Sequence, residues 1–148
     1  MIKIENGIHY IYSKVRPDTI IHIAIPYIHE FLEHNTDART DLISPKEILQ
    51  LSFLQLKDQQ SFRPHKHIEH LNVKGRKIAQ ESWVVLKGTV QCHYYDIDKS
   101  YIDYILVYEG GISITLYGGH TYTALERSLV YEFKTGPYLG QSDDKEFI

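Results

Sequence analysis

The sequence predicts an all-β protein, built as a sandwich or barrel of short antiparallel strands. Runs of β-branched and aromatic residues follow one another along the chain, and turn signals separate them at intervals of about 8–12 residues. The 12 tyrosines lie mostly within these runs, where aromatic side chains fit a pleated surface well. With 148 residues and an apolar fraction of 43%, the chain is long enough to bury a core as one domain.

The N-terminal part is expected to form strands and one short helix. The Asn6-Gly7 pair is a hairpin turn signal, and alternating apolar residues on both sides of it predict two strands within residues 1–13. Thr19–Ile25 is β-branched and predicts a third strand, and we expect these strands to add to one sheet of the barrel. Pro26–His34 predicts a short helix, because proline suits the first turn and apolar residues follow at helical spacing.

The barrel is expected to span 46–148, with 1–45 as an N-terminal extension of the same single domain, 1–148. A strand is predicted at Lys46–Lys57, for which a helix is the competing interpretation, and Ile68–Gln80 is expected to loop out. The tail from Thr135 is expected to be rich in loops. The further strands are predicted at the segment around His65–His67 and at Ser82–Leu86, Thr89–Asp96, Tyr101–Tyr108, Ile112–Leu116, His120–Ala124 and Arg127–Lys134.

Composition excludes several classes of protein. A net charge of -3 gives no electrostatic reason to expect binding to nucleic acid or to an anionic membrane. Cys92 is the single cysteine, so no disulfide can form within the chain. The N-terminus lacks the apolar stretch of a signal peptide, and no run approaches the roughly 20 apolar residues of a membrane span. We therefore expect a cytoplasmic protein.

Four residues in and after the segment at 63–88 suggest a metal site. His65 and His67 are two positions apart in a segment expected to be extended, so their side chains should share one face of a strand. Glu81 opens an apolar run, where a carboxylate needs an explanation, and His120 follows a Tyr-Gly-Gly turn signal. Three imidazoles and one carboxylate would leave two open positions in an octahedral site, which suits a divalent ion such as Fe, Mn, Ni or Zn.

These residues resemble the first motif of the cupin superfamily, which has His-x-His, a gap, a Glu, six residues and a Gly. Glu81 and Gly88 are separated by the six residues 82–87, as that motif asks. The second motif supplies one more histidine, which His120 would match. The resemblance implies a cupin-type double-stranded β-helix, a jelly-roll barrel, in which the ligands of one divalent metal ion are His65, His67, Glu81 and His120.

The chain departs from the cupin pattern at three places. The 13 residues 68–80 separate His67 from Glu81, where the general pattern has only a few, so Glu69 remains an alternative carboxylate ligand. In the second motif, Tyr117 stands where a glycine is usual and Ala124 stands in place of the closing asparagine.

A closer resemblance is to the WbuC-type cupins of bacterial polysaccharide gene clusters, and it covers roughly Arg39 to the C-terminus. It implies a metal-binding cupin, or an enzyme that acts on a small carbohydrate-related substrate in polysaccharide biosynthesis. The resemblance rests on the Pro-His-x-His segment, on an E-x-K-x-G-P-Y string and on a terminal Asp-Lys-x-Phe string, whose residues are Glu132, Lys134, Gly136, Pro137, Tyr138, Asp144, Lys145 and Phe147.

A substrate pocket is expected beside the metal, and its candidate residues are Arg63, His70, Tyr122, Lys134 and Tyr138. Alternation puts Tyr122 on the face of His120, and Lys134 with Arg63 would suit an anionic sugar.

Two other functions remain open from the sequence. The first is a metal-independent sugar-nucleotide isomerase or epimerase, in which His65 or His67 would be an acid/base group. The second is a non-catalytic cupin that binds a small molecule. The tyrosine- and isoleucine-rich N-terminal strands also predict a homodimer, because an unpaired strand edge invites pairing with a second copy.

Overall fold

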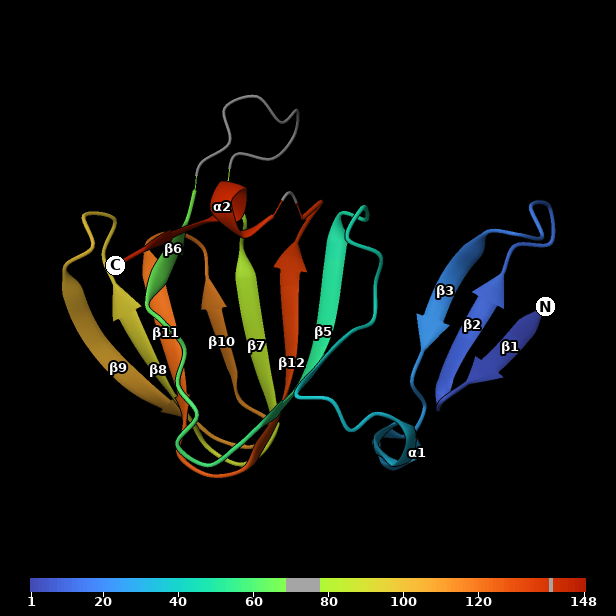
Figure 1. The fold of residues 1–148 in the computed structure, drawn as a ribbon, viewed down its shortest axis with the longest axis horizontal. Coiled ribbons are helices and arrows are strands. Elements are labelled where there is room, and N and C mark those ends of the chain that lie inside the picture. The colour runs from blue at the N-terminus through green and yellow to red at the C-terminus, as the bar shows by residue number, and fades with distance from the viewer. Residues whose placement is uncertain (69–77, 139) are drawn as a thin grey trace. The chain divides into compact units, whose positions relative to one another are not determined.

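The computed structural model describes residues 1–68, 78–138 and 140–148, and these form two compact units, Met1–Asp37 and Ala38–Ile148. The N-terminal unit has three antiparallel strands, β1 (Ile2–Glu5), β2 (Ile8–Tyr12) and β3 (Ile20–Ala24), followed by helix α1 (Ile28–His34). The predicted hairpin and helix are therefore present (Figure 1). The strands pair in the order β1-β2-β3 as a sheet of their own, so the expectation that they extend a barrel sheet is wrong.

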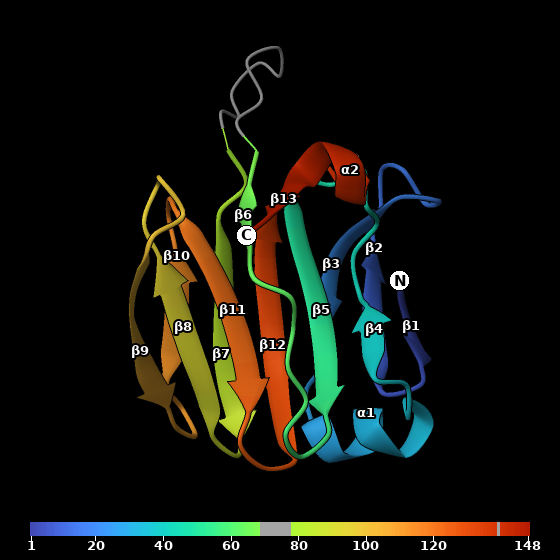
Figure 2. The same cartoon turned by 60° about the vertical axis from the view of Figure 1, so that its left-hand side comes forward.

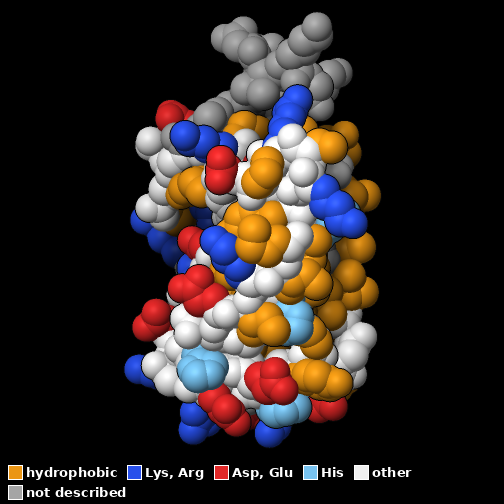
Figure 3. Space-filling model, turned by 90° about the vertical axis from the view of Figure 1, so that its right-hand side faces the viewer, with side chains coloured by type: hydrophobic (Ala, Val, Ile, Leu, Met, Phe, Trp, Pro, Cys, Tyr) orange, Lys and Arg blue, Asp and Glu red, His pale blue; other side chains and the backbone are white. Residues whose placement is uncertain are grey.

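Local chemistry explains this small unit. Asn6 and Gly7 both have positive φ, 50° and 76°, which a tight hairpin turn requires and which these two residue types adopt most readily. Phe31 is fully buried and anchors the helix within the unit. Ile2 and Ile4 are exposed, and Figure 3, which faces this sheet, shows hydrophobic side chains at the surface beside charged groups and histidines.

The second unit is a barrel of two five-stranded antiparallel sheets, in the orders β10-β7-β12-β5-β4 and β13-β6-β11-β8-β9 (Figure 2). Its elements are β4 (Arg39–Asp41), β5 (Leu49–Leu56), β6 (His65–His67), β7 (Glu81–Lys87), β8 (Val90–Tyr95), β9 (Tyr101–Val107), β10 (Ile112–Thr115), β11 (Gly119–Ala124), β12 (Ser128–Thr135), α2 (Gln141–Asp144) and β13 (Lys145–Phe147).

The two sheets share one core. Alternate residues of β12 are buried, as expected for a strand with one face inside. Leu54, Trp83 and Val130 from the first sheet meet Cys92 and Tyr122 from the second, and none is more than 3% exposed. The rings of Trp83 and Tyr122 stack with their centroids 3.9 Å apart, which ties the two sheets together beside the histidines. The sequence prediction of an all-β jelly roll is confirmed.

Three short elements differ from expectation. β4 precedes residue 46 and pairs with β5, so the first sheet begins at Arg39. The tail is not only loop, because α2 and β13 lie within it and β13 pairs with β6. Three-residue strands are too short for an alternating pattern to identify, and they form here because a neighbouring strand supplies the hydrogen bonds. No helix of the described residues is long and apolar enough to cross a membrane.

The core can be tested within a single strand, β5. Leu54 is 3% exposed, so Leu54→Ala should lower the free energy of unfolding by about 2–5 kcal/mol, through lost burial and the cavity left behind. Leu49 in the same strand is 60% exposed, and Leu49→Ala should change stability by no more than about 0.5 kcal/mol. Urea denaturation followed by circular dichroism measures both, and equal effects would contradict the assignment of faces.

Candidate metal centre

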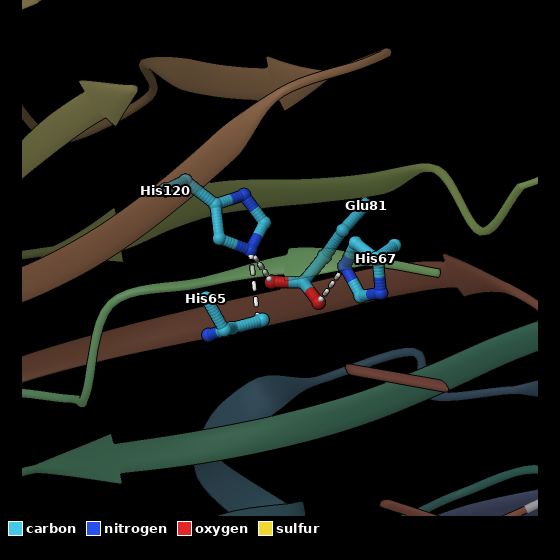
Figure 4. Close-up of side chains that lie close together, drawn as sticks. All are labelled: His65, His67, Glu81 and His120. Carbon is cyan, nitrogen blue, oxygen red and sulfur yellow. Dashed lines mark hydrogen bonds and ion pairs between the residues drawn. The ribbon is translucent and has the colours of Figure 1, made fainter. Parts of the chain in front are cut away.

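The barrel brings together the four side chains His65, His67, Glu81 and His120 (Figure 4). His65 and His67 point to the same side of β6 because alternate residues of a strand share a face. β11 pairs with β6 and places His120 directly opposite His65. Glu81 is the first residue of β7 in the other sheet, and its carboxylate lies among the three rings.

The cluster has the size of a metal site. One ligand atom from each residue can be chosen so that all four lie within 4.8 Å of one another. His120 Nε2 lies 3.2 Å from His65 Nε2 and 3.5 Å from Glu81 Oε1, and His67 Nε2 lies 3.4 Å from Glu81 Oε2. Ligand atoms that are each about 2.1 Å from one ion lie roughly 3–4 Å apart, so small movements would complete a coordination shell.

The opposite nitrogen of each imidazole has its own partner. His65 Nδ1 lies 3.1 Å from the carbonyl oxygen of Arg63, which can only accept a hydrogen bond. His120 Nδ1 lies 2.6 Å from Thr115 Oγ1, and His67 Nδ1 lies 3.5 Å from Asp144 Oδ2. These contacts fix the rings so that the three Nε2 atoms face the centre, which is the arrangement that protein metal sites use.

The carboxylate of Glu81 is also held from outside the cluster. Trp83 Nε1 lies 3.1 Å from Glu81 Oε1 and 3.2 Å from Oε2 of Glu132, so one indole N–H is shared between two carboxylates. Glu81 Oε2 and both ring nitrogens of His67 are buried and make no hydrogen bond of normal geometry within the described part of the chain, although Nδ1 lies at ion-pair distance from Asp144. Buried polar atoms without such a bond are costly, and a cation between Glu81 Oε2 and His67 Nε2 would satisfy these two atoms.

The electrostatics of His65, His120 and Glu81 favour the protonation states that a metal needs, whereas those of His67 favour the protonated ring. Burial lowers the pKa of His65 to about 4 and that of His120 to about 3, because an imidazolium would lose its hydration. Burial also acts to lower the pKa of His67, but Asp144 and Glu81 outweigh it and the pKa is raised. Burial acts to raise the pKa of Glu81, yet His120 and His67 hold it well below its ordinary value. The residues present therefore fit a divalent ion.

Two supporting residues were not identified as such from the sequence. Trp83 was seen only as part of an apolar strand, and Asp144 only as part of a terminal string shared with a family. Asp144 is 1% exposed and its carboxylate lies between His67 and Lys134 Nζ, which donates to it at 3.0 Å. The available signal was the position of Asp144 in the Asp-Lys-x-Phe string, which does not indicate its contact with His67.

A polar pocket lies between the barrel sheet and the C-terminal segment, with a volume of about 360 Å³. Of the expected substrate residues, Lys134 and Tyr138 line it. Arg63 lies elsewhere, with its guanidinium 4.1 Å from the centre of the Phe147 ring, and Tyr122 is buried with its hydroxyl 3.4 Å from His120 Nδ1. The expected residue His70 and the alternative ligand Glu69 lie outside the described residues.

Solved structures of known proteins show the same fold. A cupin superfamily protein from Desulfitobacterium hafniense is 11% identical, with a TM-score of 0.50 over 66% of this chain and 74% of that one. The fold is that of the cupins. KdgF from a Halomonas species is 16% identical, with a TM-score of 0.52 over 71% of this chain and 82% of its own. CapF, solved with the inhibitor 3-isopropenyl-tropolone, is 16% identical, with a TM-score of 0.60 over 77% of this chain and 33% of CapF.

Searches at the level of sequence gave no further identification. No protein-family model matches the chain, and no curated protein sequence matches it. The cupin fold therefore rests on the arrangement of the strands, and the WbuC-type resemblance remains an inference from short strings of residues.

Protonation of one ligand, His67, should dominate the pH dependence of metal binding. A histidine must be neutral to bind a metal, and a raised pKa means that protons begin to compete at a higher pH. His67 should therefore be the first ligand lost as pH falls, while His65 and His120 stay neutral far below pH 7. Zinc affinity, measured against a chelator between about pH 5 and pH 8, should fall about tenfold per pH unit below the pKa of His67. A fall equivalent to three protons in that range would contradict this order.

Proposed function

We propose that this chain is a metal-binding cupin in which His65, His67, Glu81 and His120 hold one divalent ion. The observation that carries the proposal is the convergence of four buried ligand atoms within 4.8 Å of one another, with the opposite nitrogens of the three imidazoles directed to other partners. The candidate ions are Fe, Mn, Ni and Zn, because imidazole and carboxylate ligands suit all four.

A bound ion would supply a Lewis acid, which polarises an oxygen of a ligand or lowers the pKa of a bound water. The chain prepares the site for it. Thr115 orients the ring of His120, and Trp83 holds Oε1 of Glu81 so that Oε2 turns to His67. Asp144 lies 3.5 Å from His67 Nδ1, where its carboxylate would orient the ring and increase its basicity as a ligand. The ring of Tyr122 and the core behind it keep water away from one side of the cluster.

We propose further that the ligand is small and carbohydrate-related, and that the protein serves polysaccharide biosynthesis, either as an enzyme or as a binding protein. The WbuC-type resemblance supports this proposal. So does the polar pocket, because its charged and hydroxyl-bearing lining suits a molecule with many hydroxyl groups. The proposal includes a cytoplasmic location.

Metal content provides the first test. Wild-type protein, reconstituted separately with Fe(II), Mn(II), Ni(II) or Zn(II) and desalted, should retain close to one equivalent of at least one ion, measured by plasma mass spectrometry. His67→Ala should reduce the affinity for that ion by at least about tenfold, because it removes a ligand. His93→Ala is the matched control, since His93 lies on β8 and its ring contacts Tyr101 outside the cluster.

The fluorescence of Trp83 provides a second measurement of metal binding in the same samples. Trp83 is the only tryptophan of the chain, and its N–H is hydrogen-bonded to Glu81, so metal binding should change its fluorescence in the wild type and in His93→Ala. Failure to retain any of the four ions would refute the metal proposal and favour a metal-independent isomerase. Retention in Glu81→Gln combined with loss in Glu69→Gln would identify the other carboxylate as the ligand.

We also propose that the chain forms a homodimer through its N-terminal sheet. β1 and β3 are the outer strands of that sheet, and Ile2, Ile4 and Ile20 are exposed on them. An edge strand with exposed apolar residues favours pairing with a second copy. Analytical ultracentrifugation should find twice the mass of the 17.3 kDa chain, and Ile4→Lys should shift the protein towards the monomer. A wild-type monomer at high concentration would refute the dimer.

A further inference from the structure

One wall of the polar pocket is a network of hydrogen-bonded charged and hydroxyl groups. Arg39 donates from Nη2 to Ser52 Oγ at 2.7 Å and to Glu132 Oε1 at 2.9 Å, and from Nε to Asp41 Oδ1 at 2.8 Å. Ser52 in turn donates to Asp41 at 2.6 Å. This network joins β4, β5 and β12 across the inner face of the sheet. Its hydrogen bonds fix the charged groups before any ligand arrives, which reduces the entropy lost on binding.

One positively charged side chain of the pocket lining lies outside the ion pairs of the wall. Arg39 is paired with Asp41 and Glu132, and Lys134 is paired with Asp144. Lys145 also lines the pocket, is half-buried, and makes no side-chain hydrogen bond or ion pair within the described residues, although its charge acts on Glu81, His65 and His120 of the cluster. Its ammonium group therefore has hydrogen-bond donors available at the pocket, and the carboxylate of a ligand can accept from them.

The position of Lys145 connects the pocket to the metal centre. β13 pairs with β6 and places Lys145 directly opposite His67, so both side chains lie on the same face of that sheet. Trp83 shares its N–H between Glu132 of the pocket wall and Glu81 of the cluster. Lys145 and Glu132 therefore both connect the pocket lining to the cluster.

We propose that this pocket is a binding site for a small hydroxycarboxylate, whose carboxylate pairs with Lys145 and whose hydroxyl groups bond to the Arg39–Glu132 wall. The volume of about 360 Å³ is near the lower end of the range of roughly 300–1,000 Å³ that is usual for ligand pockets, so it suits a molecule the size of a monosaccharide. A carboxylate alone would leave the wall unused, and a neutral sugar would leave Lys145 without a partner.

This proposal deepens the proposed function, but the pocket itself contains none of the four cluster residues. The probe is therefore D-gluconate, titrated by calorimetry into wild-type protein treated with a chelator and, separately, into metal-loaded protein. Gluconate should bind to both forms. D-Glucose, which has the hydroxyls without the charge, and propionate, which has the charge without the hydroxyls, should each bind at least about tenfold more weakly.

Variants locate the site. Lys145→Ala should weaken gluconate binding to the chelator-treated protein by at least about tenfold. Lys66→Ala is the matched control, because Lys66 lies on the neighbouring strand β6 and pairs with Glu146 at 3.6 Å, and it should bind gluconate like the wild type. The comparison of the three probes with wild-type protein stands even where the Lys145 variant does not fold.

Several outcomes would overturn the pocket proposal. One is the absence of gluconate binding to the wild type, and another is equal affinity for gluconate and glucose. Unchanged binding in Lys145→Ala would also overturn it. Binding that requires metal, is lost in Glu81→Gln and persists in Lys145→Ala would mean that the carboxylate binds the ion directly. Gluconate binding by a protein that retains no metal would instead support the pocket and refute the metal proposal, so the two failures are distinguishable.

Discussion

The burial of one carboxylate, Glu81, is the constraint on which the rest of the site depends. This side chain is 3% exposed inside the barrel, where an ionised carboxylate loses most of its hydration. This loss of hydration destabilises the folded protein unless hydrogen bonds or positive charge replace the water. The indole of Trp83 supplies one hydrogen bond, while two of the three facing imidazoles are held neutral by their own burial. The same desolvation that makes the metal-free cluster unfavourable therefore favours the entry of a cation.

Two chains of contacts connect Glu81 to further buried charged groups. Through Trp83 the first reaches Glu132, whose pKa is raised by burial and by Glu81, with Arg39 acting in the opposite sense. Through His67 the second reaches Asp144 and then Lys134, which holds Asp144 at 3.0 Å. Along both routes each buried charge has a neighbour of opposite sign or a hydrogen-bond donor. Removing one member would leave its neighbour buried and uncompensated, which makes the routes sensitive to single substitutions.

The sequence predicts the strands that carry a long alternating pattern, and it predicts the ligands that lie close together along the chain. Alternation in a strand was enough to put His65 and His67 on one face, and the turn signal before His120 correctly started β11. The N-terminal strands were placed in the wrong sheet, because alternation identifies a strand but not its partner. Asp144 could not be assigned a contact, since its neighbour His67 is 77 positions earlier and only the pairing of β13 with β6 brings them together.

Strand β6 is held in place by the strands on either side of it. This strand has only three residues, but it is fixed on both sides, by β11 and by β13, and Glu81 is fixed independently at the start of β7. The relative positions of His67 and Glu81 are thus set by the register of each strand within its own sheet and by the packing of the two sheets, and the number of residues that connect them is free to vary. A search that scans for ligands at fixed intervals will pass over proteins of this kind. A search for the pairing of a His-x-His strand with the strand of a third histidine would retain them.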